Sequence, residues 1–222
     1  MSEGLRNIAG KRAPQRFGSL QAKPPLSGPG QRIGLLGGSF NPPHDAHVLI
    51  SEIARARLGL DAVWWIVSPG NPLKSHDELL PQSERIAFSR AIAPQTWIKV
   101  TAFEADLPTA FTAATIAFLN HRFPDRRFVW LMGADNLVSF HRWQDWRSIA
   151  HSVPIAVVDR PGHRLKAMAA PSGLSYRRSF VPERLAATLP NRKPPAWTLL
   201  TGQLSDLSST AIRETKRQQT AK

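Results

Sequence analysis

The sequence predicts an α/β fold: a Rossmann-like, doubly wound parallel sheet with helices on both faces, built as a single domain. Short, continuously apolar runs alternate with segments of helical periodicity from residue 32 onward. Continuously apolar strands are typical of parallel sheets that helices cover on both faces. A chain of 222 residues is also long enough to bury a large core in one domain.

Each predicted strand is a short apolar run, and several of them end in a turn signal. The runs occupy residues 33–36, 62–67, 97–103, 128–132, 153–158 and 197–200. The first run is followed by Gly-Gly, the second by Ser-Pro-Gly, the fourth by Gly-Ala-Asp and the fifth by Asp-Arg-Pro-Gly. Because parallel strands end at one edge of a sheet, these turns are expected to converge where such sheets bind ligands.

Helical periodicity accounts for most of the segments between the strands. The predicted helices occupy residues 46–58, 81–93, 109–122, 146–151 and 208–216. Gly59 ends the first helix, Pro81 opens the second, and Pro124 follows the third. A Ser-Ser-Thr run opens the last helix. Residues 163–195 are rich in Pro, Arg and Ser and are predicted to be irregular.

A glycine-rich turn between the first strand and the first helix carries the strongest functional signal. Residues 37–47 read Gly-Gly-Ser-Phe-Asn-Pro-Pro-His-Asp-Ala-His. Glycines let the backbone approach an anion closely, and the N–H groups at a helix start hold negative charge. His44 and His47 are three residues apart, so they share one face of the first helical turn. The turn therefore predicts a phosphate site that two imidazoles face.

Other interpretations of the turn stay open at this point. Gly-Gly also marks ordinary turns, and both histidines could merely cap the helix. Neither the P-loop nor the Gly-x-Gly-x-x-Gly fingerprint is present. Zinc is a weaker alternative, because two histidines fall short of a zinc ligand set and the chain has no cysteine.

Composition and charge limit the function classes. The absence of cysteine excludes disulfides and thiolate catalysis. No apolar run approaches the roughly 18 residues of a membrane helix. The net charge of +13 would attract nucleic acid or small polyanions such as ATP, but no RNA- or DNA-binding signature accompanies it. We expect a basic, disordered tail at residues 1–31, a domain at residues 32–217 and a short tail at residues 218–222.

Two separated motifs resemble the paired signatures of the His-x-Gly-His nucleotidyltransferase superfamily. The first is the glycine-rich turn, and the second is Leu-Ser-Ser-Thr-Ala-Ile-Arg at residues 207–213. The resemblance narrows to bacterial nicotinate-nucleotide adenylyltransferases at residues 108–115, 132–137 with Trp143, and 160–162. It covers residues 32–217 and implies transfer of the adenylyl group of ATP to nicotinate mononucleotide in NAD biosynthesis. Three positions depart from the family pattern: Ser39 replaces Thr, Asn41 replaces Asp, and Ala46 replaces Gly.

The resemblance also implies roles for individual residues. The catalytic set is His44, His47, Lys74 and Arg213. The ATP-binding set is Gly37, Gly38, Ser39, Phe40, His44, His47, Gly133, Asp135, Ser208, Ser209, Thr210 and Arg213. The set for nicotinate mononucleotide is Asn41, Lys74, Thr112, Ala113 and Trp143.

Each of these assignments has a competing structural explanation. Lys74 could be a solvated surface lysine, and Arg213 a surface arginine behind an N-cap. Trp143 could pack in the core, and Asp135 could cap a helix. Thr112 and Ala113 are ordinary helix residues without the resemblance.

The implied reaction needs no general base on the protein. The second pKa of a phosphate monoester is about 6, so the attacking oxygen is already ionised near neutral pH. The protein must align two anions and neutralise the charge that builds on the ATP phosphates. Mg²⁺ should accompany ATP, held mainly by phosphates and water, and no metal site of the protein itself is predicted.

Three rival functions stay open from the residues alone. The nearest is an adenylyltransferase for another phosphate monoester, such as phosphopantetheine. The others are a non-catalytic basic nucleic-acid-binding module and a metal-dependent hydrolase. The favoured interpretation expects a cytoplasmic enzyme with ATP and nicotinate mononucleotide as partners, no specific nucleic acid and no membrane. It leaves a homo-oligomer open.

Overall fold

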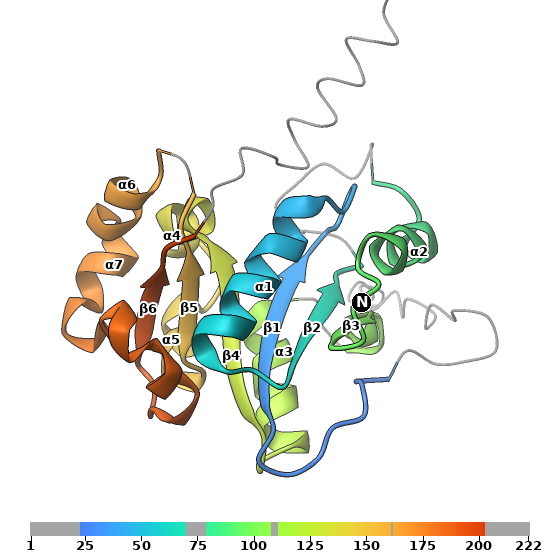
Figure 1. Cartoon of the computed structure of the whole chain (residues 1–222), viewed down its shortest axis with the longest axis horizontal. Helices are drawn as coiled ribbons and strands as arrows, with labels where there is room; N and C mark the ends of the chain where they lie inside the picture. Colours follow the sequence, from blue (N-terminus) through green and yellow to red (C-terminus); the bar gives the residue numbers. More distant parts are fainter. Residues whose placement is uncertain (1–22, 70–78, 108–110, 161, 203–222) are drawn as a thin grey trace, which may run out of the picture.

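The predicted parallel sheet is confirmed. The structure, a computed structural model, describes residues 23–69, 79–107, 111–160 and 162–202. Six parallel strands follow the order β3-β2-β1-β4-β5-β6 in one sheet (Figure 1). Their bounds are β1 Arg32–Gly38, β2 Ala62–Val67, β3 Ile98–Thr101, β4 Arg127–Gly133, β5 Ile155–Val158 and β6 Trp197–Leu200.

The strand order reverses at β1, and the pairing there has a functional consequence. The ladder between β1 and β2 runs up to the pair Gly38 and Val67. The ladder between β1 and β4 stops earlier, at the pair Leu36 and Leu131. The last two residues of β1 therefore pair with β2 only. In doubly wound sheets, ligands bind where the strand order reverses, at the carboxyl ends of the strands.

Helices cover both faces of the sheet (Figure 1). One face carries α1 Asp45–Leu58, α2 Gln82–Ile92 and the 3₁₀ helix η3 Glu183–Asn191. The other side of the molecule carries η1 Phe103–Asp106, α3 Thr112–Arg122, α4 Ala134–Phe140, α5 Trp146–Ser152, α6 Arg164–Ala169, α7 Pro171–Ser175 and η2 Arg177–Ser179. The helices α6 and α7 pack against α4 at the β6 end.

Alternate residues of each strand enter the two core layers. Trp64 and Ile66 of β2 point into the layer under α3 and α5, whereas Val63 and Trp65 point into the layer under α1 and α2. Five of the seven tryptophans are buried, namely Trp64, Trp65, Trp130, Trp146 and Trp197. The expectation that tryptophans pack in the core is confirmed at these positions.

Two segments differ from the sequence-based prediction. Residues 163–195, predicted to be irregular, contain α6, α7, η2 and η3. These helices are short, so packing against the domain stabilises them more than their own hydrogen bonds do. Ala186 and Leu189, for example, are buried in the core layer under α1. The helix α4, which directly follows β4, was not predicted, because its seven residues are too few for a clear periodicity.

The residues before β1 also differ from the expected tail. Residues 23–31 run along the domain rather than away from it. The Gly30 N–H donates to the Asp125 carbonyl at 2.7 Å, and the Thr101 hydroxyl donates to the Lys23 carbonyl at 3.1 Å. Such long-range bonds have no local sequence signal. The rest of the predicted tail, residues 1–22, and the predicted final helix and terminus, residues 208–222, lie outside the described residues.

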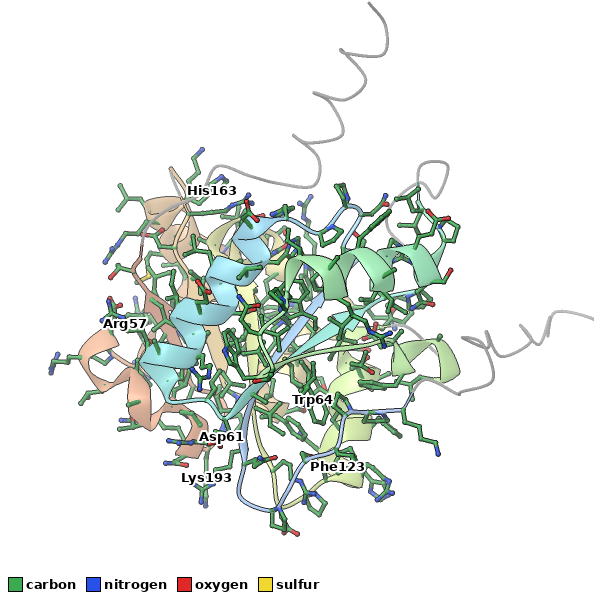
Figure 2. All side chains as sticks on the ribbon, turned by 45° about the vertical axis from the view of Figure 1, so that its right-hand side comes forward. Arg57, Asp61, Trp64, Phe123, His163 and Lys193 are labelled. Atoms are coloured by element: carbon green, nitrogen blue, oxygen red, sulfur yellow. The ribbon has the colours of Figure 1, made fainter. Side chains whose placement is uncertain are left out.

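Labelled side chains mark the two ends of the sheet in Figure 2. Figure 2 shows His163 at the end where β5 terminates, and Asp61 and Lys193 at the opposite end. Among the described residues, no helix has the length and apolarity needed to cross a membrane.

Candidate active site

The predicted phosphate-binding residues meet the end of β4 and the residue Arg160. We call residues 37–47, residues 133–135 and Arg160 together the β1–β4 junction. Asp135 and Arg160 both lie close enough to His44 for their charges to shift its pKa. A Cβ atom added to Gly133 would lie 3.9 Å from the Arg160 side chain. The structure thus brings three loops together where the sheet order reverses.

Gly37 and Phe40 shape the end of β1. A Cβ atom on Gly37 would lie 2.5 Å from the ring of Trp130, so this glycine is required for close packing. Phe40 has a φ of 48°, in the left-handed region that glycine usually occupies. The whole residue is 1% exposed, and its ring stacks on Trp65 at 5.0 Å between centroids. The Phe40 side chain is therefore not available to ATP.

His44 and His47 lie against each other at the start of α1. His44 is the extended N-cap residue, and its N–H donates to Nδ1 of His47 at 3.2 Å. The two ring centroids are 3.9 Å apart, and the His47 ring also packs on Phe40 at 4.6 Å. Nδ1 of His47 also lies 3.3 Å from the His44 carbonyl, so Nδ1 faces both a donor and an acceptor of the His44 backbone. In the tautomer that accepts the His44 N–H, the proton is on Nε2. The capping explanation is thus correct for His47, and the second ring nitrogen, Nε2, takes no part in this cap.

Burial keeps both imidazoles neutral in the ligand-free protein. The pKa of His44 is lowered to about 4, first by burial and then by the positive charge of Arg160, against the opposing charges of Asp45 and Asp135. Burial lowers the pKa of His47 to about 3, with His44 as the next cause. A bound triphosphate would oppose these shifts, because negative charge favours protonated imidazole. A bound anion would therefore raise the pKa of both histidines.

Asp135 and Arg160 form an ion pair beside the histidines. Nη1 of Arg160 lies 2.9 Å from Oδ2 of Asp135, and the side chains are 17% and 32% exposed. Oδ1 of Asp135 is buried and has no hydrogen-bond partner in the described part of the chain. A Cβ atom on Gly133 would approach that oxygen to 2.5 Å, so any larger residue there would displace the Asp135 carboxylate. Sequence reasoning did not select Arg160, although its place after the fifth strand was a usable signal.

Three of the residues assigned to nicotinate mononucleotide lie at the start of α3 and in the turn between α4 and α5. Thr112 and Ala113 are the first two residues of α3, where backbone N–H groups have no acceptor within the helix. Trp143 packs edge-on against Trp130 at 6.5 Å and against Phe140 at 5.4 Å, and it stays partly exposed. Both explanations for Trp143, core packing and stacking on a ligand, are compatible with this position.

Asn41 joins the glycine-rich turn to the start of α2. It is 5% exposed, and its Oδ1 accepts the Leu80 N–H at 3.3 Å. An aspartate, the family residue, would offer the same acceptor. The exchange therefore removes a charge and keeps the hydrogen bond.

Comparisons with known proteins agree with this geometry. A family model described as "Cytidylyltransferase-like" matches residues 35–215. A protein of Rhizobium meliloti named "Probable nicotinate-nucleotide adenylyltransferase" is 54% identical over 184 residues, covering 83% of this chain and 98% of the relative. A relative of Agrobacterium fabrum with the same name is 50% identical over 181 residues, covering 82% and 97%.

The chain belongs to the cytidylyltransferase-like family, among its nicotinate-nucleotide adenylyltransferases. A solved structure, Plasmodium falciparum nicotinic acid mononucleotide adenylyltransferase complexed with NaAD, has the same fold. Its TM-score is 0.64 at 16% identity, and the match covers 83% of each chain. The resemblance drawn from the sequence motifs is confirmed.

Part of the adenylyltransferase site lies outside the described residues. This part comprises Lys74, Ser208, Ser209, Thr210 and Arg213. Their assigned roles stay predictions. In the described ranges, no group of three His, Cys, Asp or Glu side chains could hold a metal ion.

The adenylyltransferase fold also buries a carboxyl group that sequence reasoning overlooked. Glu104 is 5% exposed, and its Oε1 accepts the Thr115 hydroxyl at 2.5 Å. Burial raises the pKa of Glu104 to about 7, against the opposing effect of that hydrogen bond. The Thr115 hydroxyl also lies 3.4 Å from the carbonyl of Phe111, the N-cap residue of α3. Glu104 thus supports the start of α3.

Above pH 7, the variant Glu104→Gln should melt at a higher temperature than the wild type. Near pH 4.5, the two proteins should melt at nearly the same temperature. The pKa of Glu104 is about 7 when folded, against an ordinary 4.5, so the folded state binds more protons between these values. The free energy of unfolding therefore falls as pH rises through this window, by about 1–3 kcal/mol. Melting curves at pH 4.5 and 8 measure the effect, with the exposed Glu52→Gln as control. Equal shifts at both pH values would contradict the prediction.

Proposed function

We propose that this protein transfers the adenylyl group of ATP to nicotinate mononucleotide, forming nicotinate adenine dinucleotide and pyrophosphate in NAD biosynthesis. The observation that carries the proposal is the β1–β4 junction, where His44, His47 and Arg160 gather beside Asp135. Relatives at 50–54% identity over nearly their whole length bear the matching name. A structural neighbour of the same fold is complexed with NaAD.

The junction can stabilise charge rather than move protons. The attacking phosphate is already ionised near neutral pH, so no buried base has to activate it. As the α–β bond breaks, negative charge builds on the departing pyrophosphate. Nε2–H of His47 and the guanidinium of Arg160 supply donors and positive charge beside it. Donors held in place before the reaction stabilise the transition state more than mobile water does.

We propose that the start of α3 selects the acceptor. Free backbone N–H groups and the positive end of a helix favour a carboxylate, which nicotinate carries and nicotinamide lacks. Thr112 and Ala113 occupy this helix start. The partly exposed ring of Trp143 would then stack on the pyridine.

Mg²⁺ would enter with ATP as part of the substrate. One oxygen of Asp135 already pairs with Arg160, and the described residues form no three-ligand cluster. The ion would then be coordinated mainly by phosphate oxygens and water. A cytoplasmic location, the absence of a nucleic-acid partner and a homo-oligomeric state stay expectations.

An acceptor comparison tests the function. The full chain is incubated with MgATP and, separately, nicotinate mononucleotide, nicotinamide mononucleotide and phosphopantetheine, and products are separated by anion-exchange chromatography. A dinucleotide should form fastest from nicotinate mononucleotide, with one pyrophosphate released for each product. Product from phosphopantetheine alone would replace the proposal with its nearest rival, and no product from any acceptor would refute it.

A further inference from the structure

A completely buried arginine of α2 lies behind the glycine-rich turn. Arg85 is 0% exposed, and its guanidinium donates to four backbone carbonyls. Nη1 donates to Ser39 at 2.6 Å and to Ser68 at 2.8 Å. Nε donates to Leu80 at 2.9 Å, and Nη2 donates to Pro69 at 3.3 Å.

These four carbonyls come from three different segments of the chain. Ser39 follows β1, Ser68 and Pro69 follow β2, and Leu80 precedes α2. Among the described residues, no carboxylate forms an ion pair with Arg85. Burial lowers the pKa of Arg85 to about 10, so the side chain keeps its charge at neutral pH. The guanidinium donates hydrogen bonds to carbonyls of three loops and so holds these loops together.

The hydrogen bond to Ser39 also sets the direction of a peptide group. In a planar trans peptide, the C=O and the following N–H point in opposite directions. The Ser39 carbonyl points to Arg85, on the β2 side of β1, so the Phe40 N–H points toward the β4 side. The Gly38 carbonyl accepts the Ser68 N–H at 2.9 Å, so the Ser39 N–H points away from β2 as well. Two successive N–H groups therefore face the same side.

That side is the one on which β1 and β4 cease to pair. It also holds His44, Asp135 and Arg160, whose mutual electrostatic effects place them together. Figure 1 shows α2 on the β2 side of β1 and β4 on the other. Consecutive backbone N–H groups that face one side form an anion-binding concavity.

The conformation that achieves this is unfavourable on its own. Phe40 has a φ of 48°, where a bulky side chain is strained. A loop released from Arg85 could relieve this strain by rotating the Ser39–Phe40 peptide. The Phe40 ring is held separately by its stacking on Trp65.

We propose that Arg85 is a positioning residue for ATP: it holds the Ser39 carbonyl back so that the Ser39 and Phe40 N–H groups face the triphosphate. The inference rests on the proposed function, because it presumes that the triphosphate binds at the β1–β4 junction. Arg85 itself contacts no substrate. Its loss should weaken ATP binding more than acceptor binding.

The test compares Arg85→Lys and Arg85→Met with a matched variant on the same helix. Gln82 is also buried, but its side chain donates to the Val67 carbonyl of β2, at 2.7 Å, whereas Arg85 donates to Ser39. Gln82→Leu therefore loosens α2 against β2 without releasing Ser39. Thermal melting of all three variants shows how much stability each one loses.

Binding of the non-hydrolysable analogue α,β-methylene-ATP is measured by calorimetry, and both KM values by steady-state kinetics. We expect Arg85→Met to weaken analogue binding and raise KM for ATP by at least 10-fold. KM for nicotinate mononucleotide should rise by less than KM for ATP. Arg85→Lys should recover part of the loss, because an ammonium group can reach one or two of the carbonyls. Gln82→Leu should melt at a lower temperature with an unchanged KM for ATP.

Several outcomes would overturn the proposal. These are unchanged analogue binding in a folded Arg85 variant, an equal rise in KM for ATP in Gln82→Leu, and failure of both Arg85 variants to fold. The last outcome would make Arg85 a residue of global stability. Failure of the proposed function would appear in the acceptor assay of the wild-type protein. Failure of the role of Arg85 would appear only in the Arg85 variants, as unchanged binding of the analogue.

Discussion

Replacing His47 with alanine should lower kcat for adenylyl transfer by about 100- to 1,000-fold, the usual loss when one preorganised donor at a developing charge is removed. Nδ1 of His47 is occupied by the His44 N–H, at 3.2 Å. Nε2, the ring nitrogen outside this cap, is therefore the one expected to contact the phosphates. Initial rates at saturating MgATP and nicotinate mononucleotide measure the effect.

A second substitution separates chemistry from capping. His47→Ala also removes the acceptor for the His44 N–H, and loss of a helix cap costs about 1 kcal/mol. Asparagine can accept that N–H but offers no imidazole. We expect His47→Asn to recover the melting temperature and not the rate. The exposed His121, on α3, supplies the control His121→Ala. Full activity in His47→Asn would show that the residue only caps the helix.

Replacing Arg160 with glutamine should lower kcat/KM for ATP by about 100-fold and raise the pKa of both His44 and His47. The rate falls because a cation beside the phosphates is lost. The pKa values rise because the positive charge of Arg160 disfavours protonation of both rings. Asp135, released from its 2.9 Å pair, would raise the pKa of His44 further.

Two measurements check this prediction independently of each other. Steady-state kinetics give the change in kcat/KM, and NMR titration of the imidazole resonances gives the pKa shifts without substrate. Arg164→Gln is the matched control, because Arg164 is 56% exposed and pairs with Asp159 at 3.6 Å. Imidazole pKa values that stay the same or fall in Arg160→Gln would show that Arg160 does not act on the histidines.

Local sequence patterns predicted the elements whose residues are consistent along the chain. The β2 run Ala-Val-Trp-Trp-Ile-Val is apolar throughout, so a strand buried on both faces was the direct expectation. The glycine-rich turn and the three-residue spacing of His44 and His47 could likewise be recognised from the sequence. The segment 163–195 was not, because its short helices depend on α1 and α4 for their packing.

The sequence by itself determined the doubly wound sheet, the glycine-rich turn after β1 and the family, because these depend on residue type and spacing within short segments. Only the tertiary structure decided that Arg85 holds the Ser39 carbonyl and that Arg160 pairs with Asp135 beside the histidines. Both contacts join residues on different elements. Their energies depend on burial and on distances of a few ångströms, which no local pattern encodes.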